Sequence, residues 1–171
     1  GLNALPMKNY LVSAFLLLSS AASFQGKVFA AELAVALQEA TATFSQDGGY
    51  TSSRAIDGVA SGSFGWAIQP NIETQTAVFE TVENIGFEVG TKLNFTLSFQ
   101  HQSPSGGTHT LGMFRISVTT DPRSAFADGL QVGGDTTANW TVLSPVSATS
   151  DQGATLTVLQ VEPRRITAQE E

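Results

Sequence analysis

The predicted fold class rests on one stretch of sequence, Lys92-Leu-Asn-Phe-Thr-Leu-Ser-Phe99. Its apolar side chains recur at every second position, which is the period of a β-strand with one buried face. Similar alternation runs through residues 76–81, 109–119 and much of 33–45. Short strands separated by glycine-containing turns are typical of an antiparallel β-sandwich. The sequence therefore predicts an all-β fold.

The expected core of this sandwich consists of apolar residues on or beside these strands. They are Phe44, Ile56, Val78, Phe79, Leu93, Phe95, Leu97, Leu111, Phe114, Ile116 and Val118. Residues 54–58 lie in a loop-rich segment with a brief helical turn, and strand-like patterns return at residues 140–143 and 154–159. The stretch between 124 and 138 is rich in glycine and aspartate and marks a boundary.

Composition narrows the class of protein. The chain has 171 residues, of which 42% are hydrophobic and 13% are charged, and this suits one globular domain with appendages. It contains no cysteine, so no disulfide supports the fold. The net charge of −7 and the lack of a basic cluster argue against nucleic-acid binding, because phosphate contacts require clustered Lys and Arg. No nucleic-acid partner is expected.

The N-terminal part of the chain has the pattern of a secretory signal peptide. Met7 and Lys8 precede the apolar run 10–22, and Val28-Phe-Ala30 places small residues before a cut at Ala31. Removal of the first 30 residues would take away two lysines and no acidic residue, leaving a net charge of −9. The sequence thus predicts a secreted protein, extracellular or periplasmic, without a membrane span after cleavage. The alternative is a retained N-terminal anchor helix.

Six blocks of the sequence occur in a recognisable order, namely Ala40–Gln46, Ala55–Gly58, Gly65–Ile68, Thr76–Thr81, Leu93–Leu97 and His109–Thr119. Together they resemble a domain of large exported planctomycete proteins, a divergent relative of the discoidin and coagulation-factor C-type modules. The resemblance implies a galactose-binding-like jelly-roll sandwich that binds carbohydrate or cell-envelope polysaccharide. Residues 140–145 and 153–159 are similar to the opening of a second such module.

These observations predict the following organisation. Residues 1–6 are of doubtful status, 7–30 are the signal peptide, 31–122 the sandwich, 123–139 a linker, and 140–171 either a truncated second module or a disordered tail. The resemblance also implies that the chain is part of a larger multidomain protein.

Asp57 and Trp66 are the first candidate site residues. In calcium-binding members of the galactose-binding-like superfamily, a carboxylate and backbone carbonyls near the loop of Asp57 hold a structural Ca²⁺, and hard cations do prefer oxygen ligands. The alternative is that Asp57 stabilises its own loop through the backbone, as Asx residues do. Trp66 either stacks on a sugar face or lies in the core, and the core is the expected place for a Trp between small residues.

Two histidines form the second candidate site. His101 and His109 flank the loop Ser103-Pro-Ser-Gly-Gly107, so a hairpin would bring them together with Arg115 or Gln100 to bind a hydroxyl-rich ligand. The alternative is that they are ordinary polar residues of a loop. For Arg115, the alternatives to a ligand contact are a solvated side chain or an ion pair with Glu80 or Glu83.

Catalytic motifs are missing from the sequence. It has no Gly-x-Ser-x-Gly, no His-Glu-x-x-His and no glycine-rich phosphate loop, and Glu80 and Glu83 fit surface charges better than a glycosidase pair. We therefore expect a non-catalytic binding module for carbohydrate rather than an enzyme. An architectural spacer and an accessory domain of a hydrolase are the alternatives.

Overall fold

The computed structural model describes residues 8–15, 32–59, 64–86, 90–99, 101, 109–151, 155–158 and 165–166. Strands dominate this part of the chain, and it contains no α-helix. The strands are β1 (Lys8–Phe15), β2 (Glu32–Val35), β3 (Leu37–Ala42), β4 (Ala77–Thr81), β5 (Lys92–Ser98), β6 (Ser117–Val118), β7 (Trp140–Val142) and β8 (Arg165–Ile166). Two short 3₁₀ helices, η1 (Ser52–Ala55) and η2 (Arg123–Ala125), complete the described elements. No helix in the described ranges has the length and apolar character needed to cross a membrane.

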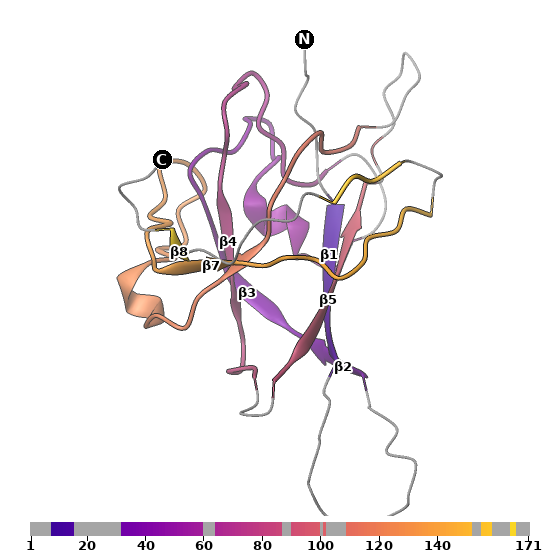
Figure 1. The fold of residues 1–171 in the computed structure, drawn as a ribbon. Helices are drawn as coiled ribbons and strands as arrows, with labels where there is room; N and C mark the ends of the chain where they lie inside the picture. Colours follow the sequence, from indigo (N-terminus) through magenta and orange to yellow (C-terminus); the bar gives the residue numbers. More distant parts are fainter. Residues whose placement is uncertain are drawn as a thin grey trace, which may run out of the picture. The chain divides into compact units, whose positions relative to one another are not determined.

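The strands form three small antiparallel sheets, ordered β2-β1-β5, β3-β4 and β6-β7-β8 (Figure 1). The chain divides into two compact units. The first unit contains Gly1–Leu111 and Ala127–Thr136, and the second contains Gly112–Phe126 and Thr137–Glu171. The prediction of a β-rich antiparallel fold is thus confirmed, although the sheets do not form a closed sandwich among the described residues.

Strand β1 occupies the middle of the first sheet. It pairs with β2 from Val12↔Val35 to Phe15↔Glu32, and with β5 from Lys8↔Ser98 to Phe15↔Lys92. These are residues that the sequence assigns to the signal peptide. If the predicted cleavage at Ala31 takes place, it separates β2 and β5 from their shared neighbour.

A bulge shapes β3. Its pairing with β4 shifts register between Gln38 and Thr41, and Glu39 between them has a φ of 44°. An extra residue in one strand bends it and increases its twist, and the left-handed conformation is costly for a residue other than glycine. The sequence leaves open a strand pair or one bent strand over 33–45. The structure resolves this as two strands in different sheets, which break at Ala36.

The segment 127–136 runs along β3 although the sequence predicts a linker there. Thr41 Oγ1 accepts the Gly129 N–H at 2.8 Å, Ala42 N–H donates to the Leu130 carbonyl at 2.8 Å, and Gly134 N–H donates to the Ala42 carbonyl at 2.9 Å. A Cβ on Gly134 would lie 2.5 Å from Thr41 Cγ2. The absence of a side chain at Gly134 is what lets the two segments approach so closely.

The Gln131 side chain joins this segment to η1 and β3. Its Nε2 donates to the carbonyls of Ala40 and Gly129 at 2.5 and 3.1 Å. Its Oε1 accepts from the Ser52 hydroxyl at 2.7 Å and from the Ser53 N–H at 3.0 Å. Ser52 is fully buried, so water cannot reach its hydroxyl and Gln131 provides the hydrogen-bond partner instead. One amide thus holds three segments of the first unit together.

The core of the first unit is built on small residues around one indole ring. Ala42, Ala55 and Trp66 are its buried centre, and Trp66 Nε1 donates to the Phe44 carbonyl at 3.0 Å. Partly buried side chains pack against this centre, namely Ile68, Ala77, Phe79, Phe99 and Leu111. Of the expected core residues, Phe79 and Leu111 are thus in contact with the core, and Val78 is 5% exposed.

The prediction of a continuous strand over 109–119 is wrong, and so is the core position of Phe114. Only Ser117 and Val118 form a strand here, because the strand that pairs with them, β7, is itself short. The Phe114 side chain is 51% exposed. An alternating pattern directs side chains inward only where a neighbouring strand fixes the pleat. Residues 155–158 are likewise exposed and are not a strand.

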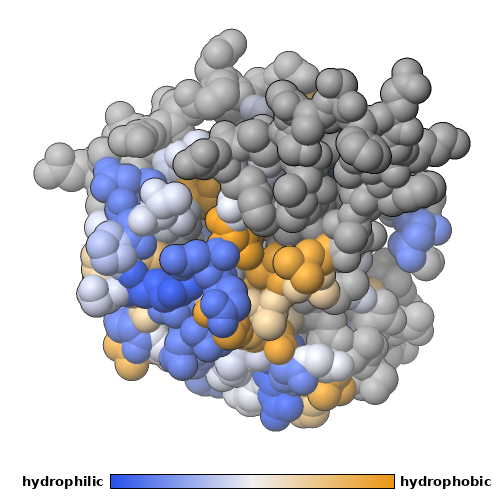
Figure 2. All heavy atoms as spheres, turned by 90° about the horizontal axis from the view of Figure 1, so that it is seen from below, coloured by the Kyte–Doolittle hydropathy of each residue, from blue (hydrophilic) through white to orange (hydrophobic). Residues whose placement is uncertain are grey.

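Apolar side chains also reach the surface elsewhere. Figure 2 shows orange, hydrophobic residues exposed between blue, hydrophilic ones on one face of the molecule. Ile72, Met113 and Val146 are 85%, 85% and 98% exposed. The buried core is small, so hydrogen-bonded contacts such as those of Gln131 carry a larger share of the specificity of the fold.

We expect Gln131→Leu to lower the free energy of unfolding by about 2–4 kcal/mol, because it removes the partners of the buried Ser52 hydroxyl and the Ala40 carbonyl. Urea denaturation followed by circular dichroism measures this change. Gln69→Leu, at an exposed position, is the matched control and should leave the free energy of unfolding almost unchanged. An equal loss in both variants would contradict the role of Gln131.

The position of β1 makes a second prediction. A chain that begins at Ala31 should melt at a lower temperature than one that begins at Met7, because β2 and β5 lose the backbone hydrogen bonds of their shared neighbour. Hydrogen exchange should show the loss of protection in β5. Equal melting temperatures with unchanged exchange in β5 would mean that β1 does not stabilise the sheet.

Candidate functional site

The pairing of β6 with β7 brings two polar loop segments together in the second unit. Ser117 lies opposite Val142 and Val118 opposite Thr141, and the Leu143 N–H extends the pairing by donating to the Ile116 carbonyl at 2.9 Å. The residues that follow β6 and those that precede β7 therefore meet at one end of the strand pair.

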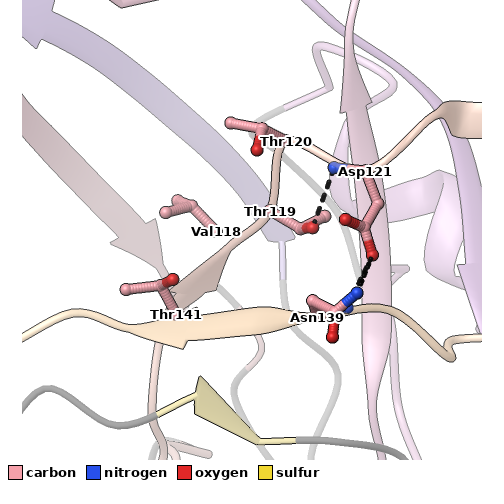
Figure 3. A pocket seen from close by; sticks show the side chains of 6 residues that line it. All are labelled: Val118, Thr119, Thr120, Asp121, Asn139 and Thr141. Carbon is pink, nitrogen blue, oxygen red and sulfur yellow. Dashed lines mark hydrogen bonds between the residues drawn. The ribbon is translucent and has the colours of Figure 1, made fainter.

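A hollow lies at this meeting point, and we call it the Asp121 hollow (Figure 3). It has a volume of about 120 Å³. Six residues line it, namely Val118, Thr119, Thr120, Asp121, Asn139 and Thr141. Five of these six carry a hydroxyl, a carboxylate or an amide, so the lining is polar.

Hydrogen bonds fix the geometry of the hollow. Asp121 Oδ2 accepts the Asn139 backbone N–H at 2.7 Å and Asn139 Nδ2 at 2.9 Å. The Asp121 backbone N–H donates to Thr119 Oγ1 at 3.1 Å. These are the dashed lines in Figure 3. Asn139 therefore orients the Asp121 carboxylate, and Thr119 holds the Asp121 backbone.

Aromatic packing supports the hollow from the same unit. The rings of Phe126 and Trp140 meet edge to face, with centroids 5.5 Å apart and planes at 70°. Phe126 is buried and follows η2, while Trp140 begins β7 next to Asn139. This contact anchors the loop that carries Asn139, because aromatic pairs in this arrangement add to the burial of their area.

Sequence reasoning missed the Asp121 hollow. It places Asp121 at the end of the predicted sandwich and Asn139 at the end of the predicted linker, and assigns no site to either residue. The polar residues Thr119-Thr-Asp121, which are typical of a turn, are the only sign of the site in the sequence. The hydrogen-bond partner of Asp121, Asn139, lies 18 residues further along the chain. Only the register between β6 and β7 places Asn139 against Asp121.

The structure brings His101 and His109 together, as the hairpin hypothesis predicts. Their ring centroids are 4.6 Å apart and tilted by 51°, and the His109 N–H donates to the His101 carbonyl at 3.5 Å. Both rings are only partly exposed, and the buried Nδ1 of His109 meets no hydrogen-bond partner in the described part of the chain. Gln100, the other expected neighbour, lies outside the described residues.

Arg115 belongs to the second unit, where its side chain is exposed, whereas the two histidines belong to the first. Each unit holds its own part of the expected histidine and arginine site. The structure therefore supports the contact between the two histidines. A site that joins them to Arg115 stays a prediction.

Trp66 lies in the core, which confirms the core interpretation. It is 7% exposed, and its indole N–H is used by the Phe44 carbonyl. A platform for a sugar ring needs an open aromatic face. The position of Trp66 therefore gives no support to a stacking role.

The contacts of Asp57 fit the local-loop interpretation. Its Oδ1 accepts the Val59 N–H at 2.8 Å, which is an Asx turn, and its Oδ2 lies 3.4 Å from Arg54 Nη1. Arg54 also lies over the Phe64 ring, with its Cζ 5.7 Å from the centroid. A guanidinium beside the carboxylate opposes a bound cation. No group of three or more metal-ligating acidic or histidine side chains occurs among the described residues. A calcium site built from Asp57 and backbone carbonyls stays a prediction.

Comparison with known proteins adds no further assignment: no protein-family model, no curated protein and no solved structure matches this chain.

We expect chelation of divalent cations to leave the melting temperature of the chain unchanged, and Asp57→Ala to lower its stability by about 1 kcal/mol through loss of the Asx turn. Asp57→Asn, which keeps an acceptor for the Val59 N–H, is the matched control. Thermal denaturation with and without EDTA tests this. A drop on chelation that disappears in Asp57→Ala would instead reveal a bound cation.

Proposed function

We propose that this chain is an exported, non-catalytic module that binds carbohydrate or cell-envelope polysaccharide, and that its antiparallel sheets belong to a galactose-binding-like β-sandwich. The observation that carries the proposal is the Asp121 hollow. Its carboxylate, its amide and two of its hydroxyls are held on loops beside a strand pair, where binding groups are commonly placed, and the third hydroxyl, that of Thr141, is on β7. Such groups both donate and accept hydrogen bonds, as sugar hydroxyls do.

The chemistry of the lining supports binding rather than catalysis. Asp121 is the one titratable side chain among the six residues of the hollow. Hydrolysis of a glycosidic bond in most families requires two carboxyl groups on opposite sides of the bond. A single carboxylate that already accepts two hydrogen bonds from Asn139 suits the orientation of a ligand and lacks a catalytic partner within the hollow.

The second candidate function is that of an architectural spacer in a larger surface protein. The observation that favours it is the burial of Trp66 and the partial burial of His101 and His109 in the first unit. These side chains are candidates for a ligand contact in the sequence, and a spacer would use them only for packing. The two functions differ in one measurable property, which is affinity for a glycan.

The test is binding of the whole chain to insoluble chitin, cellulose and peptidoglycan sacculi, measured as depletion of the protein from solution. Soluble glucans, mannans and galactans are tested by affinity gel electrophoresis. We expect at least one of these to bind with a dissociation constant on the order of micromolar to millimolar, since a small polar site makes few hydrogen bonds. Failure of the folded chain to bind any of them would favour the spacer.

A further inference from the structure

The hydrogen bonds inside the Asp121 hollow leave a defined set of groups for a ligand. Asp121 Oδ2 already accepts two N–H groups, whereas no described residue donates to Asp121 Oδ1. Thr119 Oγ1 accepts the Asp121 N–H, so its own hydroxyl hydrogen is left to donate. The Thr141 hydroxyl makes no hydrogen bond with a described side chain or backbone group. The lining of the hollow (Figure 3) thus includes an acceptor and hydroxyl donors that the described part of the chain leaves available.

This combination matches two adjacent hydroxyls on one ligand. A hydroxyl donates one hydrogen bond and accepts others. One hydroxyl of a vicinal pair can donate to Asp121 Oδ1, while the other accepts from a threonine hydroxyl. A bond to an ionised acceptor is about twice as strong as one between neutral groups, so Asp121 is the principal contact.

The charge of the lining selects against acidic ligands. Asp121 is the one charged side chain that lines the hollow, and a carboxylate or sulfate beside it would meet a like charge. A cation does not fit well either, because Oδ2 is taken by two N–H donors and no second carboxylate lines the hollow. Neutral hydroxyl groups are the chemistry that remains.

The size of the hollow limits how much of a ligand it holds. At about 120 Å³ it is smaller than the roughly 300 Å³ at which pockets for drug-sized ligands begin. It therefore admits one edge of a sugar ring and leaves the rest outside. Such a site contacts an exposed edge of a residue in a longer chain.

We propose that the Asp121 hollow binds the vicinal hydroxyls on one edge of a neutral sugar residue, with Asp121 Oδ1 as acceptor and the hydroxyls of Thr119 and Thr141 as donors. This inference rests on the proposed glycan-binding function and adds the place of contact and the class of sugar. The site discriminates against uronic acids through the charge of Asp121.

The experiment is an NMR titration of the ¹⁵N-labelled whole chain in EDTA, followed at the backbone amides of Asp121 and Asn139. The probes are the methyl glycosides of galactose, mannose and glucose, each paired with the corresponding uronic acid. We expect at least one neutral glycoside to shift the resonances of both backbone amides. The corresponding uronic acid should bind about tenfold more weakly or not at all.

Two pairs of variants assign the contact. Asp121→Asn should weaken the binding of the neutral glycoside by about tenfold and reduce the discrimination against its uronic acid. Asp128→Asn is the matched control, because Asp128 also accepts two backbone N–H groups, from Leu130 and Asp135, but lies in the first unit. It should leave binding unchanged.

The second pair concerns the hydroxyls. Thr141→Val should weaken binding about threefold, the scale of one neutral hydrogen bond. Thr96→Val, at an exposed position of β5, should have no effect. Each variant is first checked for a native thermal transition, so loss of the fold is not taken for loss of a contact.

The outcomes separate this inference from the proposed function. Tighter binding of uronic acids at the same amides, or sugar-induced shifts confined to other residues, would overturn the neutral-sugar site and leave glycan binding intact. An equal effect of Asp121→Asn and Asp128→Asn would overturn the contact with Asp121. If no glycoside shifts any amide and no polysaccharide binds, both the inference and the proposed function are wrong.

Discussion

The first unit depends on the contact between β3 and the segment 127–136, and Gln131 is its centre. Buried backbone groups must find partners, and a core built on alanines and one tryptophan provides limited apolar area. The Gln131 amide satisfies groups on β3, on η1 and on its own segment at once. The close approach requires glycine at position 134, so the hydrogen bonds and the steric constraint support each other.

Three aspartates in this structure perform related tasks with different consequences. Asp57 and Asp128 each accept the N–H of the residue two positions ahead, so each stabilises its own turn. Asp121 accepts instead from Asn139, on another segment, and leaves one carboxylate oxygen directed to no described protein donor. The first two carboxylates are used by the fold. The third is positioned by the fold and retains capacity for a ligand.

The site expected from sequence and the site supported by geometry differ for a physical reason. Trp66 and the two histidines are conspicuous in the sequence because their side chains can bind sugars, yet large side chains also gain most from burial. In this chain Trp66 is in the core and the histidines contact each other. The groups left open are small and polar, namely threonines, an aspartate and an asparagine, and these residues are common in any loop.

The sequence alone specified the β-rich class and strands such as β4 and β5, because the alternation of apolar and polar side chains is a local property. It did not determine which strands pair, that β1 lies between β2 and β5, or that residues 109–119 form a strand of only two residues. Those features depend on the partner that each backbone finds. The Asp121 hollow belongs to the same category, since the register of β6 with β7 alone brings Asn139 to Asp121. Hydrogen-bond pairing joins segments that are far apart in the chain, so it is fixed only in the folded protein.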